Sequence, residues 1–252
     1  IVRGAEDQDT VFAETLGRLK SMFQFALAIS ALIGGFLAAW SWVYVLLPSS
    51  LSLFSALIFA FTIRLPPGCE EVSGKSGGED GLRASFVHLK RSLAEFLGHR
   101  RMLANGTAEV IGTAVGEATY QFRVTFIAGV WPAAWLGASR MLDNLCAALG
   151  FLFAGKLIRR FGEYPLLIAG KVYGRLANLA GLLYPGIHSP VVMSSAGLFY
   201  GLTDVSRQSL MHQLYNDGQR ATLGSVVALL GALVLALFAP LLGFVADLYG
   251  PV

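Results

Sequence analysis

Long apolar runs, separated by short polar or charged stretches, dominate the hydrophobic pattern of the chain. A membrane-spanning α-helix needs about 20 mostly apolar residues, because each residue adds about 1.5 Å to its length. The runs are close to that length. The pattern therefore predicts about seven transmembrane helices, at residues 21–40, 44–63, 106–122, 134–158, 165–184, 190–210 and 223–246.

The longest polar segment, residues 64–105, divides these predicted helices into two groups. Its first half is rich in Pro, Gly and Ser, which is typical of a flexible linker. In its second half, apolar residues recur at helical spacing among basic ones, which predicts an amphipathic helix at the membrane surface. The residues are Phe86, Leu89, Leu93, Phe96 and Leu97, with Lys90, Arg91, Arg100 and Arg101 around them. We expect part of an N-terminal bundle at 1–63, a cytoplasmic linker at 64–105 and a C-terminal bundle at 106–252.

Lys and Arg are distributed unevenly between the polar stretches. Residues 1–20 contain three, residues 64–101 seven, residues 156–160 three and residues 207–220 two, whereas the turns at 41–47, 128–134 and 185–190 contain none. Because basic loops stay on the cytoplasmic side of a membrane, this alternation predicts cytoplasmic charged loops and extracytoplasmic bare turns. Arg123, just past the third predicted span, fits this pattern poorly.

The composition supports a lipid environment and excludes several other classes of protein. Apolar residues make up 55% of the chain and charged residues 14%, far from the balance of a soluble domain. The net charge of +3 is spread between the apolar runs and forms no basic face for nucleic acid. The two Cys and four His lack metal-ligand spacing, so we expect no metal and no cofactor. The chain begins with Ile1 and no leader segment, so we expect a longer natural protein.

One loop has the spacing of a known family motif. Residues 155–162 read Gly-Lys-Leu-Ile-Arg-Arg-Phe-Gly, which resembles the cytoplasmic loop motif of the major facilitator superfamily: Gly, three residues, Asp, a basic residue, any residue, Gly. Arg159 stands where the family usually has Asp, so this loop lacks the family's carboxylate. Gly155, Arg160 and Gly162 occupy the remaining motif positions.

Further features resemble drug-efflux-like members of this superfamily. The stretch at 217–225 is similar to the polar loop before their eleventh helix, and residues 3–7 are similar to the end of their fourth helix. Gly4 and Asp7 are echoed by Gly201 and Asp204, as parallel repeats would produce. The resemblance implies a partial major-facilitator fold, from the end of helix four to helix eleven, in an all-α polytopic membrane protein.

Charged residues inside the predicted spans are the candidate functional residues, because burying a charge in a bilayer costs about 2.5–3.5 kcal/mol. Arg140 and Asp143 lie three residues apart and could form a buried pair on one helix, with either a substrate or proton-coupling role or a purely structural one. The resemblance implies a cavity-lining helix here. Glu117 lies deep in the third predicted span, where a carboxylate removed from water would suit proton exchange. A structural role is the alternative.

The cytoplasmic end contains candidate gate residues. Asp204 and Arg207 approach that end of the sixth predicted span, where they could contact Arg220 or the loop carrying Arg159 and Arg160. An ordinary ion pair at the membrane interface is the alternative.

The predicted function is secondary active transport of a small molecule by alternating access, most simply proton-coupled efflux across the plasma (inner) membrane. Its partners would be membrane lipid, the small-molecule substrate and protons. A membrane enzyme would require clustered catalytic groups, which the sequence does not show. A non-transporting scaffold, or a degenerate remnant of the same fold, remains the alternative.

Overall fold

The computed structural model describes residues 5–62, 87, 90, 93–94, 97–98, 100–214 and 217–249. Nearly all of these residues are helical and none of them lies in a strand, which confirms the predicted all-α class. The helices are α1 (Ala5–Trp40), α2 (Trp42–Thr62), α5 (Arg100–Val130), the short 3-10 helix η1 (Ala133–Trp135), α6 (Leu136–Phe161), α7 (Glu163–Leu183), α8 (Ser189–Leu214) and α9 (Asp217–Tyr249). Most of the predicted linker and its amphipathic helix lie outside the described residues.

Among the described residues, five helical stretches are long and apolar enough to cross a membrane, as an integral membrane protein requires. They are Val11–Trp40, Trp42–Thr62, Ala133–Phe161, Glu163–Leu183 and Leu223–Val245. The predicted spans at 106–122 and 190–210 fall on α5 and α8, which are long enough but are not apolar enough over the length of a span. Seven spans therefore remain a prediction, and a major-facilitator fold remains one too.

The chain forms two compact units. The first contains α1, η1, α6, α7, α8 and the part of α5 from Tyr120 onward. The second contains α2, the part of α5 up to Thr119 and most of α9. The candidate site residues fall mainly in the first unit, which we describe in detail.

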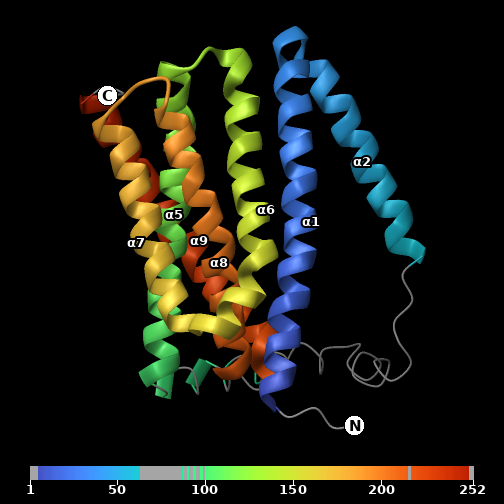
Figure 1. Ribbon diagram of the computed structural model, residues 1–252, viewed down its shortest axis with the longest axis vertical. Coiled ribbons are helices and arrows are strands. Elements are labelled where there is room, and N and C mark those ends of the chain that lie inside the picture. Colours follow the sequence, from blue (N-terminus) through green and yellow to red (C-terminus); the bar gives the residue numbers. More distant parts are fainter. Residues whose placement is uncertain are drawn as a thin grey trace. The chain divides into compact units, whose positions relative to one another are not determined.

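In the first unit, α6 packs between α1 and α8, and α8 packs between α6 and α7 (Figure 1). Glycines permit these close contacts. A Cβ atom on Gly35 would lie 2.7 Å from the Cα of Gly137, and one on Gly201 would lie 2.5 Å from the backbone nitrogen of Phe151. Since real Cβ atoms do not approach that closely, the α1–α6 and α6–α8 contacts require glycine at these positions.

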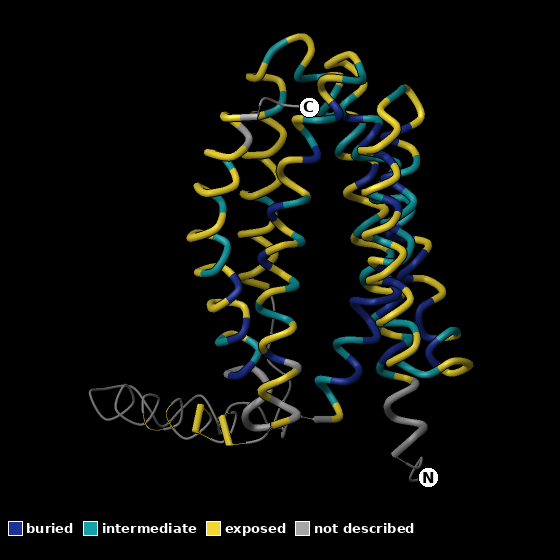
Figure 2. The backbone as a smooth tube through the Cα atoms, turned by 90° about the vertical axis from the view of Figure 1, so that its left-hand side faces the viewer, coloured by how far each residue is buried: buried dark blue, intermediate teal, exposed yellow. Residues whose placement is uncertain are grey.

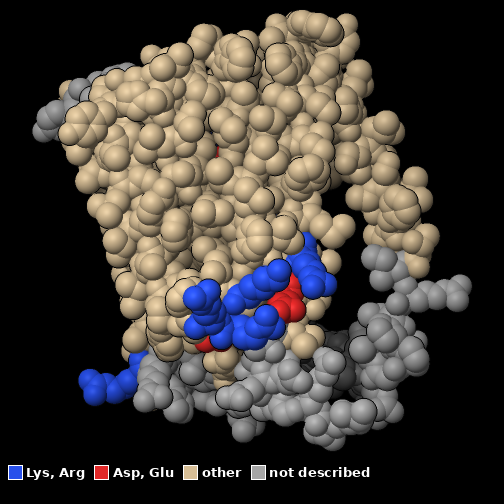
Figure 3. All heavy atoms as spheres, in the orientation of Figure 1, with Lys and Arg blue, Asp and Glu red and all other residues tan. Residues whose placement is uncertain are grey.

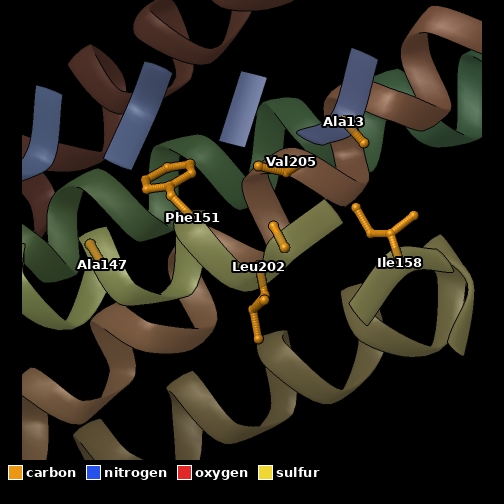
Figure 4. Packing of buried hydrophobic residues seen from close by; sticks show 7 residues of the cluster. Ala13, Ala147, Phe151, Ile158, Leu202 and Val205 are labelled. Atoms are coloured by element: carbon orange, nitrogen blue, oxygen red, sulfur yellow. The ribbon is translucent and has the colours of Figure 1, made fainter. Parts of the chain in front are cut away.

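Small and apolar side chains fill the core where α1, α6 and α8 meet. The cluster consists of Ala13, Ala147, Phe151, Ala154, Ile158, Leu202 and Val205 (Figure 4). Outside such buried stripes, the helices expose many large apolar side chains. Figure 2 shows how exposed residues alternate with buried ones along the helices. An apolar exterior of this extent is unfavourable in water and favourable in lipid.

A single residue, Gly162, connects α6 to α7. Its φ of +79° is a conformation that favours glycine. Its backbone N–H donates to the carbonyl of Ile158 at 2.7 Å, which ends α6. The second glycine of the loop motif is therefore explained by the turn. The first, Gly155, lies so close to α1 that a Cβ there would be 2.9 Å from the Cα of Glu14.

Candidate functional site

A buried ion pair joins three helices of the first unit. Nη1 of Arg123 on α5 donates to Oδ1 of Asp143 on α6 at 3.2 Å, and Nη2 donates to the hydroxyl of Ser194 on α8, also at 3.2 Å. Arg123 and Asp143 are each only 9% exposed. Because opposite charges this deeply buried depend on each other for compensation, the pair links the packing of α5, α6 and α8.

Helix periodicity explains why these residues meet. One buried face of α6 includes Ser139, Asp143, Ala147 and Gly150, which are spaced three or four residues apart as one side of a helix requires. Asp143 thus lies on the same stripe that packs against neighbouring helices. Ser194 donates its own proton to the carbonyl of Pro190 at 2.7 Å, which leaves its oxygen free to accept from Arg123.

The predicted ion pair between Arg140 and Asp143 is wrong. Asp143 pairs with Arg123 instead, and the Arg140 guanidinium lies over the ring of Tyr120, 3.8 Å from its centroid. Side chains on a helix lean toward its N-terminus, so Arg140 leans away from an acid three residues further along. A cation on a facing helix reaches the carboxylate more directly. The two predicted residues nevertheless belong to one neighbourhood.

The burial predicted for Glu117 is not found. Its side chain is exposed on α5, and it belongs to the second compact unit. The role of Glu117 as a proton carrier stays a prediction. Of the two carboxylates predicted for proton coupling, Asp143 is the one that the structure buries.

A second polar cluster centres on Asp204 of α8, which is 7% exposed. Its carboxylate accepts from Lys20 of α1, from Arg207 at 2.6 Å and from Gln208 at 2.9 Å. The ammonium of Lys20 also lies 5.6 Å from the ring centroid of Phe151. The cluster therefore fastens α1 to α8 beside the apolar core.

Two more polar contacts fasten the same helices. Arg159 pairs with Glu14 of α1 at 3.3 Å, and Glu163 of α7 accepts from Ser209 and Gln213 of α8, each at 3.1 Å. Polar contacts thus join α1 to α6 and α7 to α8, in addition to the close approach of Gly155 to α1.

The gate contact predicted between Asp204 and the loop carrying Arg159 and Arg160 is not found. The alternative, an ordinary ion pair, forms between Asp204 and Arg207, and Arg159 binds Glu14. Arg160 lies 5.3 Å from the ring centroid of its neighbour Phe161. The side chain of Arg220 lies outside the described part of the chain.

The two ends of the first unit differ chemically. At one end, Trp131 donates from its indole nitrogen to the carbonyl of Ile187 at 2.8 Å, so the turns on either side of α6 and α7 meet there. On the face drawn in Figure 3, Lys and Arg gather toward the other end. This separation is what the predicted alternation of charged loops and bare turns requires.

The residues of these clusters that the sequence pattern missed include Arg123, Lys20 and Glu14. Arg123 had a signal, because it was a basic residue next to a turn predicted to lack basic residues. The third span was expected to end before it, whereas α5 continues to Val130. Lys20 and Glu14 belong to the charged opening, and nothing in the local pattern indicates their partners.

Comparisons with known proteins do not identify a family for this chain. No protein-family model matches it, and neither a curated protein nor a solved structure matches it. The resemblance to the major facilitator superfamily therefore rests on the motif residues, and function has to be argued from the two polar clusters.

Proposed function

We propose that the protein is a secondary active transporter of the major facilitator type, which moves a small molecule by alternating access and couples efflux to protons. The observation that carries the proposal is the buried Arg123–Asp143 pair between α5, α6 and α8. Ionised residues inside a membrane protein are costly, and they commonly belong to substrate or proton pathways.

The pair supports proton coupling because its two members compensate each other's charge. A proton on Asp143 would remove the carboxylate's charge and leave Arg123 buried without its partner. Breaking a buried pair in this way costs about 3–5 kcal/mol. A free-energy change of that size is sufficient to shift the balance between two helix arrangements that differ by a few kcal/mol.

The contact between α1 and α6 supports alternating access. Glycines allow the two helices to touch near Gly35 and Gly137, and Gly155 allows the same near Glu14. Polar contacts from Lys20 and Arg159 fasten the charged end. Smooth, small-residue contact surfaces are suited to sliding, and ion pairs at one end are suited to a gate that opens and closes.

The proposal is tested by flux in proteoliposomes carrying an imposed pH gradient, with a panel of amphipathic dyes as substrates. We expect gradient-dependent flux in the wild-type protein and its loss in Asp143→Asn. Glu117→Gln tests the other carboxylate. Glu109→Gln is a matched control, because Glu109 lies on α5 like Glu117 and takes no part in the buried pair. Its carboxylate accepts a hydrogen bond of 2.9 Å from the hydroxyl of Thr113.

If the wild-type protein inserts into the proteoliposomes but carries no flux of any dye, the alternative of a non-transporting scaffold is favoured instead. The Glu14–Arg159 pair is compatible with that alternative, since Arg159 replaces the expected acid and serves as a brace between α1 and α6. Cross-linking of α1 to α6 then separates the two ideas. A transporter requires this contact to open, whereas a scaffold keeps it closed.

A further inference from the structure

We propose that the Arg123–Asp143 site binds the carboxylate group of a small organic anion. The inference rests on the proposed transport function and deepens it by naming the chemical class of the substrate. Its basis is a pair of buried polar atoms without a hydrogen-bond partner in the described structure, Nε of Arg123 and Oγ of Ser139.

Arg123 has an unused donor. Its two terminal nitrogens bind Asp143 and Ser194, and its Nε–H has no acceptor although the residue is 91% buried. A buried donor without an acceptor costs about 1–3 kcal/mol, and more when it is charged. The guanidinium therefore has one side to which an acceptor group would bind favourably.

Ser139 supplies a second donor in the same neighbourhood. It precedes Asp143 by four residues and so lies one turn away on the same face of α6. Its side chain is 2% exposed, and its hydroxyl has no partner. An acceptor group beside Asp143 would find unpartnered donors on two helices, Arg123 of α5 and Ser139 of α6.

The charge of this neighbourhood favours an anion over water. Arg123 and Arg140 carry two positive charges, and Asp143 carries one negative charge. The contact of Arg140 with the Tyr120 ring does not neutralise its charge. Water would satisfy the hydrogen bonds and leave the excess charge, whereas a carboxylate would satisfy both and matches the planar fork of a guanidinium. The exposed ring of Tyr120 offers an apolar surface for the rest of the ligand.

Three ligands of one shape test the proposal: benzoate, benzamide and benzamidinium, which are negative, neutral and positive. Each is measured by equilibrium dialysis against the protein in lipid nanodiscs. We expect benzoate to bind roughly 10-fold more tightly than the other two, which corresponds to one hydrogen-bonded charge. Ser139→Ala keeps the Arg123–Asp143 pair and is expected to weaken benzoate binding roughly 10-fold. Ser195→Ala is the matched control, because this hydroxyl contacts Tyr173 instead.

Equal binding of the three ligands, stronger binding of benzamidinium, or no benzoate binding at all would overturn the inference. So would benzoate binding that Ser139→Ala and Ser195→Ala change to the same extent. Flux of cationic dyes with no preference for benzoate would refute the carboxylate site and leave transport standing. Selective, Ser139-dependent benzoate binding without any flux would do the reverse.

Discussion

Removing one member of the Arg123–Asp143 pair is expected to destabilise the protein more than removing both. Two unit charges about 4 Å apart attract each other by roughly 4 kcal/mol when the effective dielectric constant is about 20. Asp143→Asn would leave the buried Arg123 without its anion, which costs about 3–5 kcal/mol. Arg123→Gln would leave the buried Asp143 without its cation, although the more distant Arg140 would compensate part of the carboxylate's charge.

The double variant carries two neutral amides, which can hydrogen-bond to each other. We expect it to be within about 1 kcal/mol of the wild-type protein, because replacing both charges of a buried pair is often close to neutral. A double-mutant cycle would then give a coupling energy on the order of 5 kcal/mol, because each single substitution costs about 3 kcal/mol or more and the double one about 1 kcal/mol or less. The free energy of unfolding is measured by denaturant titration in mixed micelles for the four proteins. Additive effects of the two substitutions would refute the reasoning, since they would mean that neither charge depends on the other.

Three further predictions concern packing, the charged cluster and the orientation of the helices. Gly201→Ala is expected to destabilise the protein by about 1–3 kcal/mol, because its Cβ would lie 2.5 Å from the nitrogen of Phe151. Gly174→Ala, whose Cβ would meet no atom within 4 Å, is expected to be neutral or slightly stabilising. Equal unfolding midpoints of the two variants would contradict the close α6–α8 contact. Lys20→Met is expected to cost about 1–3 kcal/mol of stability, because it removes a partner of the buried Asp204. Arg159→Gln is expected to cost less than about 1 kcal/mol, because its pair with Glu14 is largely exposed. Thermal unfolding that ranks the two variants in the opposite order would show that burial does not decide the strength of these pairs. In a background without Cys69 and Cys146, an impermeant thiol reagent should label Ile187→Cys on intact cells and Arg159→Cys only after permeabilisation, and labelling of both from outside would refute the orientation.

The apolar runs were sufficient to predict the helices but not where each one ends. The fourth predicted span, 134–158, agrees closely with the stretch Ala133–Phe161, because its ends are marked by a Pro-containing turn and by Gly162. The third predicted span, 106–122, ends before α5 does, because Arg123 interrupts the apolar run. A buried charge whose partner is on another helix cannot be distinguished, along the sequence, from a charge in a loop.

Two combinations of Asp and Arg at i,i+3 spacing, of which one forms an ion pair, show why the site could be predicted only in part. Asp204 precedes Arg207, so the longer side chain of Arg207 leans back toward the acid and the pair forms at 2.6 Å. Arg140 precedes Asp143, and in that order the cation leans away. Residue order along the helix therefore carried information that spacing did not. The contacts of Asp143 with Arg123, and of Asp204 with Lys20, depend on tertiary packing between α1, α5, α6 and α8.

The most direct test of the central claim compares two kinds of transport by Asp143→Asn. Proton coupling through Asp143 requires that this variant lose uphill, gradient-driven flux while it still exchanges substrate across a membrane without a gradient. Exchange needs the helices to rearrange but needs no proton. We predict retained exchange and lost gradient-driven accumulation, with Glu109→Gln behaving as wild type in both assays. Undiminished gradient-driven accumulation by Asp143→Asn would contradict the account.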